Sequence, residues 1–185
     1  MLAWHPRGPT FLTVVYNQDD REKMRLAVLV LEVVLGLLYA NMCEWVFHKY
    51  AFHVLGRKKK SIFAFHWWRH HQLSRRHGFV DEDYLKPWGS GKELWSLLAA
   101  GLLHSPLFFI YPVFTLTLFY GIFNYYYVHR KSHIDTEWAK KHLRWHYEHH
   151  MGKNQNVNYC VTKPWFDWVM GTRVKYDYLF EKNEK

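Results

Sequence analysis

The feature that most constrains the fold is an apolar stretch of 35 residues, Leu94 to Val128, which contains no Asp, Glu, Lys or Arg. It is too long for one membrane-spanning helix, which needs about 20 apolar residues. Pro106 and Pro112 lie near its middle. Each proline removes a backbone N–H and clashes with the preceding helical turn. The sequence therefore predicts a membrane hairpin of two short helices over residues 92–128, with both ends on the same side of the bilayer.

A second apolar block, residues 26–47, is interrupted only by Glu32 and Glu44 and is about the length that crosses a bilayer as a helix. The basic run Arg57–Lys60 follows it and is typical of a cytoplasmic flank. Buried helices of a soluble bundle are the alternative for both blocks. We predict an all-α integral membrane protein, with one span, a helical hairpin and a cytosolic helical cap that carries a histidine-rich di-metal site.

A chain of 185 residues allows a single domain. We divide it into an N-terminal segment (1–25), the first span with the first histidine cluster (26–55), a cytosolic segment with the second (56–91), the membrane hairpin (92–128), and a cytosolic cap with the third and fourth (129–175). The first residues show no small-residue cleavage site, so we expect no signal peptide. Cys43 and Cys160 lie far apart in no metal-binding pattern, which favours reduced thiols.

Ten of the 14 histidines fall into four clusters that lie beside the apolar blocks. The clusters are His48 and His53; His66, His70 and His71; His129 and His133; and His146, His149 and His150. Residues three or four apart share one face of a helix, so their imidazoles can converge on one metal ion or bridge to an adjacent one. Ten nitrogen ligands match two ions of about five ligands each. The clusters therefore predict a di-metal site on one side of the membrane.

The spacing of the first cluster does not fit a regular helix. On an ideal α-helix His48 and His53 point about 140° apart, so this cluster requires a helix end or a bend. Among the other histidines, His77 lies about 20° from His66 on a continuous helix and is a further candidate ligand. His142 shares the face of His146 and is a candidate neighbour of the site. We expect His5 at the surface and His104 in the core or at a helix interface.

Ligand type alone leaves the metal open, because imidazole suits Zn, Cu, Fe and Ni. The HExxH motif of zinc hydrolases is absent, and Glu148 in the string from His146 to His150 is misplaced for it. The formal net charge of +9 suits an anionic membrane face or nucleic acid. No nucleic-acid-binding motif appears, so we expect no nucleic-acid partner.

The spacings HxxxxH, HxxxHH, HxxxH and HxxHH, separated by a predicted membrane hairpin, resemble the fatty acid hydroxylase and sterol desaturase superfamily. The tail adds Asn158–Thr162, Trp165–Asp167 and Gly171–Thr172, which are similar to the closing segment of that superfamily. The last histidine cluster most resembles the fatty acid and sphingolipid hydroxylase branch. The resemblance covers about residues 44–173, most of the chain.

The resemblance implies a non-haem centre of two iron ions, with zinc as a replacement in purified protein, that uses O2 to hydroxylate or desaturate a C–H bond of a lipid. The ten clustered histidines carry over as its ligands, with no catalytic residue beyond them. No fused cytochrome b5 domain is recognisable, so electrons are expected from a separate donor such as cytochrome b5 or ferredoxin. The implied location is the endoplasmic reticulum of a eukaryote or the inner membrane of a bacterium, with the metal site on the cytosolic side.

A fatty acyl or sphingolipid chain is the first choice of substrate, followed by a sterol, a carotenoid or an alkylglycerol. Four polar residues, Glu44, Asp135, Asn158 and Asp167, are expected around the ligands. Glu44 lies one turn before His48 and is expected either to orient it or to be a carboxylate on the helix surface. Asp135 is also expected to N-cap a helix over residues 136–150. Two alternatives stay open, a membrane protein that binds or transports metal through a histidine relay and a non-catalytic member of the same family.

Overall fold

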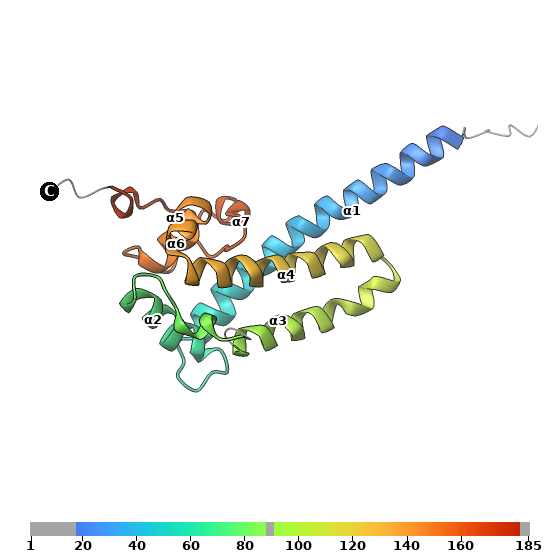
Figure 1. The fold of residues 1–185 in the computed structure, drawn as a ribbon. Helices are drawn as coiled ribbons and strands as arrows, with labels where there is room; N and C mark the ends of the chain where they lie inside the picture. The colour runs from blue at the N-terminus through green and yellow to red at the C-terminus, as the bar shows by residue number, and fades with distance from the viewer. Residues whose placement is uncertain (1–17, 88–90, 182–185) are drawn as a thin grey trace, which may run out of the picture.

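The computed structural model describes residues 18–87 and 91–181, and over these ranges the chain forms seven α-helices, several short 3-10 and π segments, and no strand. The predicted all-α class is confirmed. The segment before Gln18, which includes His5, lies outside the described residues. The long helix α1 and the hairpin of α3 and α4 extend to one side, and the shorter helices gather at the opposite end (Figure 1).

The first apolar block forms helix α1, which runs from Gln18 to Val46 and continues as a π-helix over Phe47–Leu55. The helix begins upstream of the predicted block, where Asp19 and Asp20 in its first turn interact favourably with the helix dipole. From Asp19 to Leu55 it is long and apolar enough to cross a membrane, and only 11% of its most apolar window is buried in the protein. A core helix of a soluble protein would bury that face.

The second apolar block forms the predicted hairpin. Helix α3 (Gly91–His104) is followed by a 3-10 turn (Ser105–Phe109) and by helix α4 (Pro112–Ile134), which returns beside α3 (Figure 1). Pro106 is the second residue of the 3-10 turn and Pro112 is the first residue of α4, so both lie in a first turn, where a missing N–H leaves no helical hydrogen bond unmade. Helix α4 continues past residue 128, so the predicted boundary between hairpin and cap lies within one continuous helix. The membrane setting of the hairpin stays a prediction.

Helices α1 and α4 cross at a line of small residues. A Cβ atom added to Gly36 would lie 2.8 Å from the Cβ of Thr117, and one added to Gly121 would lie 2.8 Å from the Cβ of Ala40. Gly36 and Ala40 are four residues apart, as are Thr117 and Gly121, so each helix presents two small residues on one face. Small residues at this spacing let two apolar helices approach closely.

We expect Gly36→Leu to destabilise the protein, because the new side chain must push α1 away from α4. Overpacking of this kind costs about 1–3 kcal/mol, and each kcal/mol lowers the melting temperature of a chain of this size by about 2–4 °C. Gly101→Leu is the matched control, since an added Cβ there meets only the ends of the Ile122 and Phe119 side chains, at 3.7 and 4.0 Å. Equal melting temperatures for the two variants in detergent would contradict this packing.

The remaining elements form the cap. They are a π-helix (His66–His70), α2 (His71–Arg76), a 3-10 turn (Glu82–Leu85), α5 (Thr136–His142), α6 (Arg144–Met151), α7 (Trp165–Val169) and a 3-10 turn (Asp177–Leu179). The Asp135 side chain accepts a hydrogen bond from the Trp138 amide at 2.9 Å, which confirms it as an N-cap. The single helix predicted over residues 136–150 is wrong. Leu143 leaves the helical conformation and buries its side chain in a cluster with Tyr125 and Val161.

Candidate metal centre

Ten imidazoles meet at the junction of the cap with α1 and α4, and none is more than 4% exposed. Nine of them form two groups in which the potential ligand nitrogens all lie within 4.8 Å of one another. Site 1 consists of His48, His53, His66, His71 and His149, and site 2 consists of His70, His129, His133 and His150. The tenth, His146, lies beside site 2, with its Nε2 atom 3.1 Å from that of His133.

The spacing between nitrogens within each site suits a metal ion. Two imidazoles bound to one ion at about 2.1 Å, at angles of roughly 90–110°, place their nitrogens about 3.0–3.4 Å apart. In site 1 the Nε2 atom of His66 lies 3.0 Å from that of His48 and 3.1 Å from that of His71. The Nε2 atom of His149 lies 3.2 Å from that of His53 and 3.3 Å from that of His71. The site therefore has the dimensions that an ion with several imidazole ligands requires.

Two π-helical segments explain the histidine pairs that are five residues apart. A π-turn closes its hydrogen bond between residues i and i+5, which brings these two side chains onto one face. His48 and His53 lie in the π-segment that ends α1, and both contribute to site 1. His66 and His71 also belong to site 1, and the amide of His71 donates to the carbonyl of His66 across the second π-segment. The bend required for the first cluster is thus a change of helix type.

Adjacent histidines contribute to different sites. His70 belongs to site 2 and His71 to site 1, while His149 belongs to site 1 and His150 to site 2. The rings of His71 and His150 stack across the boundary with their centroids 4.3 Å apart. The two sites are therefore direct neighbours, and the two HH pairs join them.

Backbone carbonyls fix the ring orientation of three ligands. The Nδ1 atom of His149 donates to the carbonyl of Val157 at 2.6 Å, that of His133 donates to the carbonyl of Phe79 at 2.8 Å, and that of His48 donates to the carbonyl of Tyr159. A carbonyl can only accept, so Nδ1 carries the proton in each ring. In the neutral imidazole Nε2 then presents a lone pair to the site, as a metal ligand must.

Two buried carboxylates fix the ring orientation of two further ligands, both in site 2. The Nδ1 atom of His70 donates to Asp81 at 2.7 Å, and that of His129 donates to Glu93 at 2.5 Å. Tyr84 donates from its hydroxyl to the other oxygen of Glu93 at 2.6 Å. These three partners were missed in the sequence. The one available signal was Glu93, an isolated carboxylate at the edge of a long apolar block, where ionisable residues are commonly functional.

The chemistry of the donor set fits a pair of transition-metal ions. The Nε2 atoms of His70 and His129 are buried without a hydrogen-bond partner in the described structure. Burial and neighbouring imidazoles hold the pKa of His66, His71, His146 and His150 well below the ordinary value, and burial lowers the pKa of His149 to about 3. A buried imidazole nitrogen without a hydrogen-bond partner costs about 1–3 kcal/mol. Metal binding would remove this cost, so neutral nitrogens that converge in a buried space are well suited to be metal ligands.

The loop over residues 157–162 supplies two of the orienting carbonyls, and two carboxylates hold it. Glu44 accepts from the amides of Val161 and Thr162, the latter at 2.8 Å. Asp167 accepts from the amides of Tyr159 and Cys160, both at 2.9 Å. The prediction that Glu44 orients His48 directly is wrong, since the partner of His48 is the Tyr159 carbonyl in this loop.

The other two expected neighbours of the ligands lie behind the site or outside it. Asn158 binds the backbone of Val174 through both its amide nitrogen and its carbonyl oxygen, each at 2.8 Å. It has a φ of 57°, a left-handed conformation that asparagine tolerates. Asp135 is exposed and serves as the N-cap of α5. In the described part of the chain, neither side chain hydrogen-bonds to a clustered imidazole.

Asp167→Ala is expected to destabilise the protein by about 3–5 kcal/mol, because it leaves two buried amides without an acceptor. It also removes the acceptor of the Thr172 hydroxyl at 2.7 Å. Thermal unfolding in detergent measures the loss. Asp177→Ala is the control, since that carboxylate is 73% exposed and pairs with Arg144 at the surface. A loss below about 1 kcal/mol for Asp167→Ala, the size expected of a surface pair, would show that the loop is held by other contacts.

The two additional candidate histidines lie outside the site. His77 is exposed and its nearest charged partner is Glu82, at 3.6 Å. The predicted continuous helix from His66 ends at Arg76, which turns His77 away. His142 is exposed against the ring of Trp138, because α5 ends there. His104 lies at the interface of α3 with α1, where its Nε2 atom is 3.1 Å from the Tyr39 hydroxyl, as expected.

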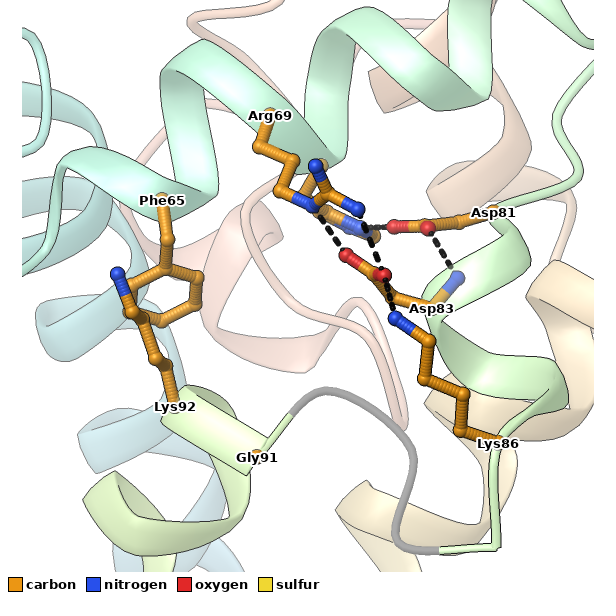
Figure 2. A pocket seen from close by; sticks show the side chains of 8 residues that line it. Phe65, Arg69, Asp81, Asp83, Lys86, Gly91 and Lys92 are labelled. Carbon is orange, nitrogen blue, oxygen red and sulfur yellow. Dashed lines mark hydrogen bonds and ion pairs between the residues drawn. The ribbon is translucent and has the colours of Figure 1, made fainter.

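A cleft of about 410 Å³ opens beside site 2, and His70 is the one clustered histidine that lines it. Asp83 accepts from Arg69 at 2.8 Å and from Lys86 at 2.6 Å on one wall, and Phe65 and Lys92 face this group across the cleft (Figure 2). The hydrogen bond from Arg69 holds the pKa of Asp83 well below its usual range. The cleft is therefore lined by charged side chains on the side of site 2 where Asp81 and His70 lie.

Fold and site together define a class of protein, an all-helical protein with a long exposed apolar helix and paired all-histidine metal-binding groups at its end. A sequence profile of the fatty acid hydroxylase family matches residues 33–172. The chain therefore belongs to the fatty acid hydroxylase family, a family of di-iron hydroxylases. Searches among curated proteins and among solved structures found no significant match.

Proposed function

We propose that this protein is an O2-dependent lipid hydroxylase or desaturase that uses two iron ions to oxidise a C–H bond of a fatty acyl or sphingolipid chain. The observation that carries the proposal is the pair of adjoining, buried, all-imidazole sites. Sites 1 and 2 would each hold one ion, with His146 as a further ligand beside site 2. The ions would supply the activation of O2 and the removal of hydrogen, chemistry that no side chain provides alone.

The residues of the chain hold the imidazoles in place and keep water away from them. Carbonyl and carboxylate partners hold the imidazoles in one orientation, and Phe52, Phe79 and Tyr84, each at most 3% exposed, close the space around them. Exclusion of water protects a reactive centre from side reactions. The exposed apolar face of α1 suits a bilayer from which a lipid chain can reach the site. The basic run Arg57–Lys60 supports a site on the cytosolic side. Two electrons would come from a separate protein such as cytochrome b5 or ferredoxin.

Metal transport through a histidine relay is less well supported. A relay requires ligands along the membrane-crossing helices. The clustered imidazoles instead lie together, and His104 is the one described histidine within the hairpin helices away from them.

The test is a comparison of cell lipids with and without expression of the protein. Hydroxylation adds the mass of one oxygen atom to a lipid, and desaturation removes the mass of two hydrogens. We expect one such product with the wild-type protein and with His142→Ala, and none with His146→Ala, because His142 is exposed whereas His146 is buried beside site 2. A lipid profile that the wild-type protein leaves unchanged, despite two bound ions, would favour a metal-binding or non-catalytic role.

A further inference from the structure

We propose that the two sites are not equivalent and that site 2 holds its ion more tightly than site 1. The inference rests on the proposed two-metal function. It concerns the hydrogen-bond partners behind the ligands, which differ in charge between the two sites.

In site 2, two ligands are backed by negative charge. Asp81 accepts from His70 and Glu93 accepts from His129, and each carboxylate is only 1% exposed. Both carboxylates are fixed from the other side as well. Asp81 accepts from the Asp83 amide at 2.9 Å, and Glu93 accepts from Tyr84 at 2.6 Å. Neither carboxylate can turn away from its imidazole without losing a second hydrogen bond.

In site 1, the partners are neutral. The carbonyls of Tyr159 and Val157 accept from His48 and His149, and the side-chain amide of Gln155 lies 2.9 Å from Nδ1 of His71. Over residues 18–87 and 91–181, no carboxylate hydrogen-bonds to a site 1 imidazole. The asymmetry therefore consists of two carboxylates that hydrogen-bond directly to ligands, both in site 2. The carboxylates of Glu44 and Asp167 reach site 1 only indirectly, through the loop over residues 157–162.

A carboxylate behind an imidazole strengthens metal binding in two ways. It makes the ring nitrogen more basic, and its charge offsets that of the cation where little water screens it. Loss of one such partner typically costs about 10–100-fold in metal affinity. We therefore expect the affinity of site 2 to exceed that of site 1 by at least about 10-fold.

The test is release of Zn²⁺ from the full chain in detergent, with metal content measured against increasing chelator. We expect two steps, one ion per chain in each. Glu93→Gln and Asp81→Asn keep a hydrogen-bond acceptor and remove only the charge. Each should lower the affinity of the tighter site about 10–100-fold and leave that of the other site unchanged, so that the two steps approach each other or merge. Gln155→Ala is the comparison variant on site 1; it removes a neutral group, so it should leave the affinity of the tighter site unchanged.

Release of both ions from the wild-type protein in a single step would overturn the proposal, as would an equal loss of affinity at both sites in Glu93→Gln and Asp81→Asn. The wild-type measurement needs no variant, so poor folding of either variant leaves the proposal testable. Binding of fewer than two ions would overturn the two-metal function along with it, whereas two ions released together would overturn only the difference between sites.

Discussion

His149→Ala and His150→Ala are each expected to remove about one of two bound metal ions, although the two residues are neighbours on α6. His149 contributes to site 1 and His150 to site 2. Loss of a ligand should exceed the 10–100-fold loss of affinity that an outer hydrogen-bond partner typically causes. Both variants should therefore lose lipid oxidation, because the proposed chemistry needs both ions. Metal content per chain after gel filtration measures the first effect, and lipid analysis measures the second.

The control for both variants is His142→Ala, since His142 is exposed and its ring packs against Trp138, away from both sites. This variant should keep two ions and full activity. Each variant also needs a melting curve to show that it is folded. Two ions retained in folded His149→Ala and in folded His150→Ala would mean that these imidazoles are not ligands, and the division of the HH pairs between two sites would be wrong.

The sequence was sufficient to predict which histidines come together, because the spacing that places two side chains on one helix face is a local property. Residues four apart share a helix face, so His129 and His133 could be expected to meet, and both lie in site 2. The length and composition of the apolar blocks likewise predicted a long helix and a hairpin. Properties of this kind depend on residues close together in the chain.

Other parts of the site depend on residues that are distant in sequence. Glu93 accepts a hydrogen bond from His129, which lies 36 positions further along the chain, and no sequence pattern links the two residues. The carbonyls of Tyr159 and Val157 could not be predicted, because any residue offers a carbonyl and only the folded loop aims it. The break at Leu143 arises because burial of its side chain outweighs the local preference for a continuous helix.

The π-segments show where a local pattern was present but ambiguous. The interval of five between His48 and His53 contradicts an α-helix, and it could have indicated a bend, a helix end or a change of helix type. The same interval recurs between His66 and His71, where an α-helical pairing of His66 with His70 competes with it. In the structure His66 joins His71 in site 1, while His70 joins site 2. The sequence alone could not decide between these pairings.

Acid is expected to destabilise the metal-free protein strongly between pH 7.5 and 5.5. Burial lowers the pKa of His66, His71, His146, His149 and His150 in the folded state. In the unfolded chain each imidazole titrates near about 6.5. As the pH falls through that value, the unfolded chain takes up protons that the folded protein cannot, so the free energy of unfolding decreases and the folded state becomes less stable. The contribution of these residues is fully present above about pH 6.5 and is lost below it.

The size of the effect makes it easy to detect. Each of the five imidazoles contributes up to about 1.4 kcal/mol at one pH unit below the unfolded pKa, or about 7 kcal/mol together, against a total stability of about 5–15 kcal/mol for a typical protein. Melting curves of chelator-treated protein should fall sharply from pH 7.5 to 5.5 and stay level from pH 7.5 to 8.5. Bound metal should shift the fall to lower pH, because the ion competes with protons for the same nitrogens. Metal-free protein that melts at the same temperature at pH 5.5 and 7.5 would show that these imidazoles reach water or a proton-sharing partner in the folded state.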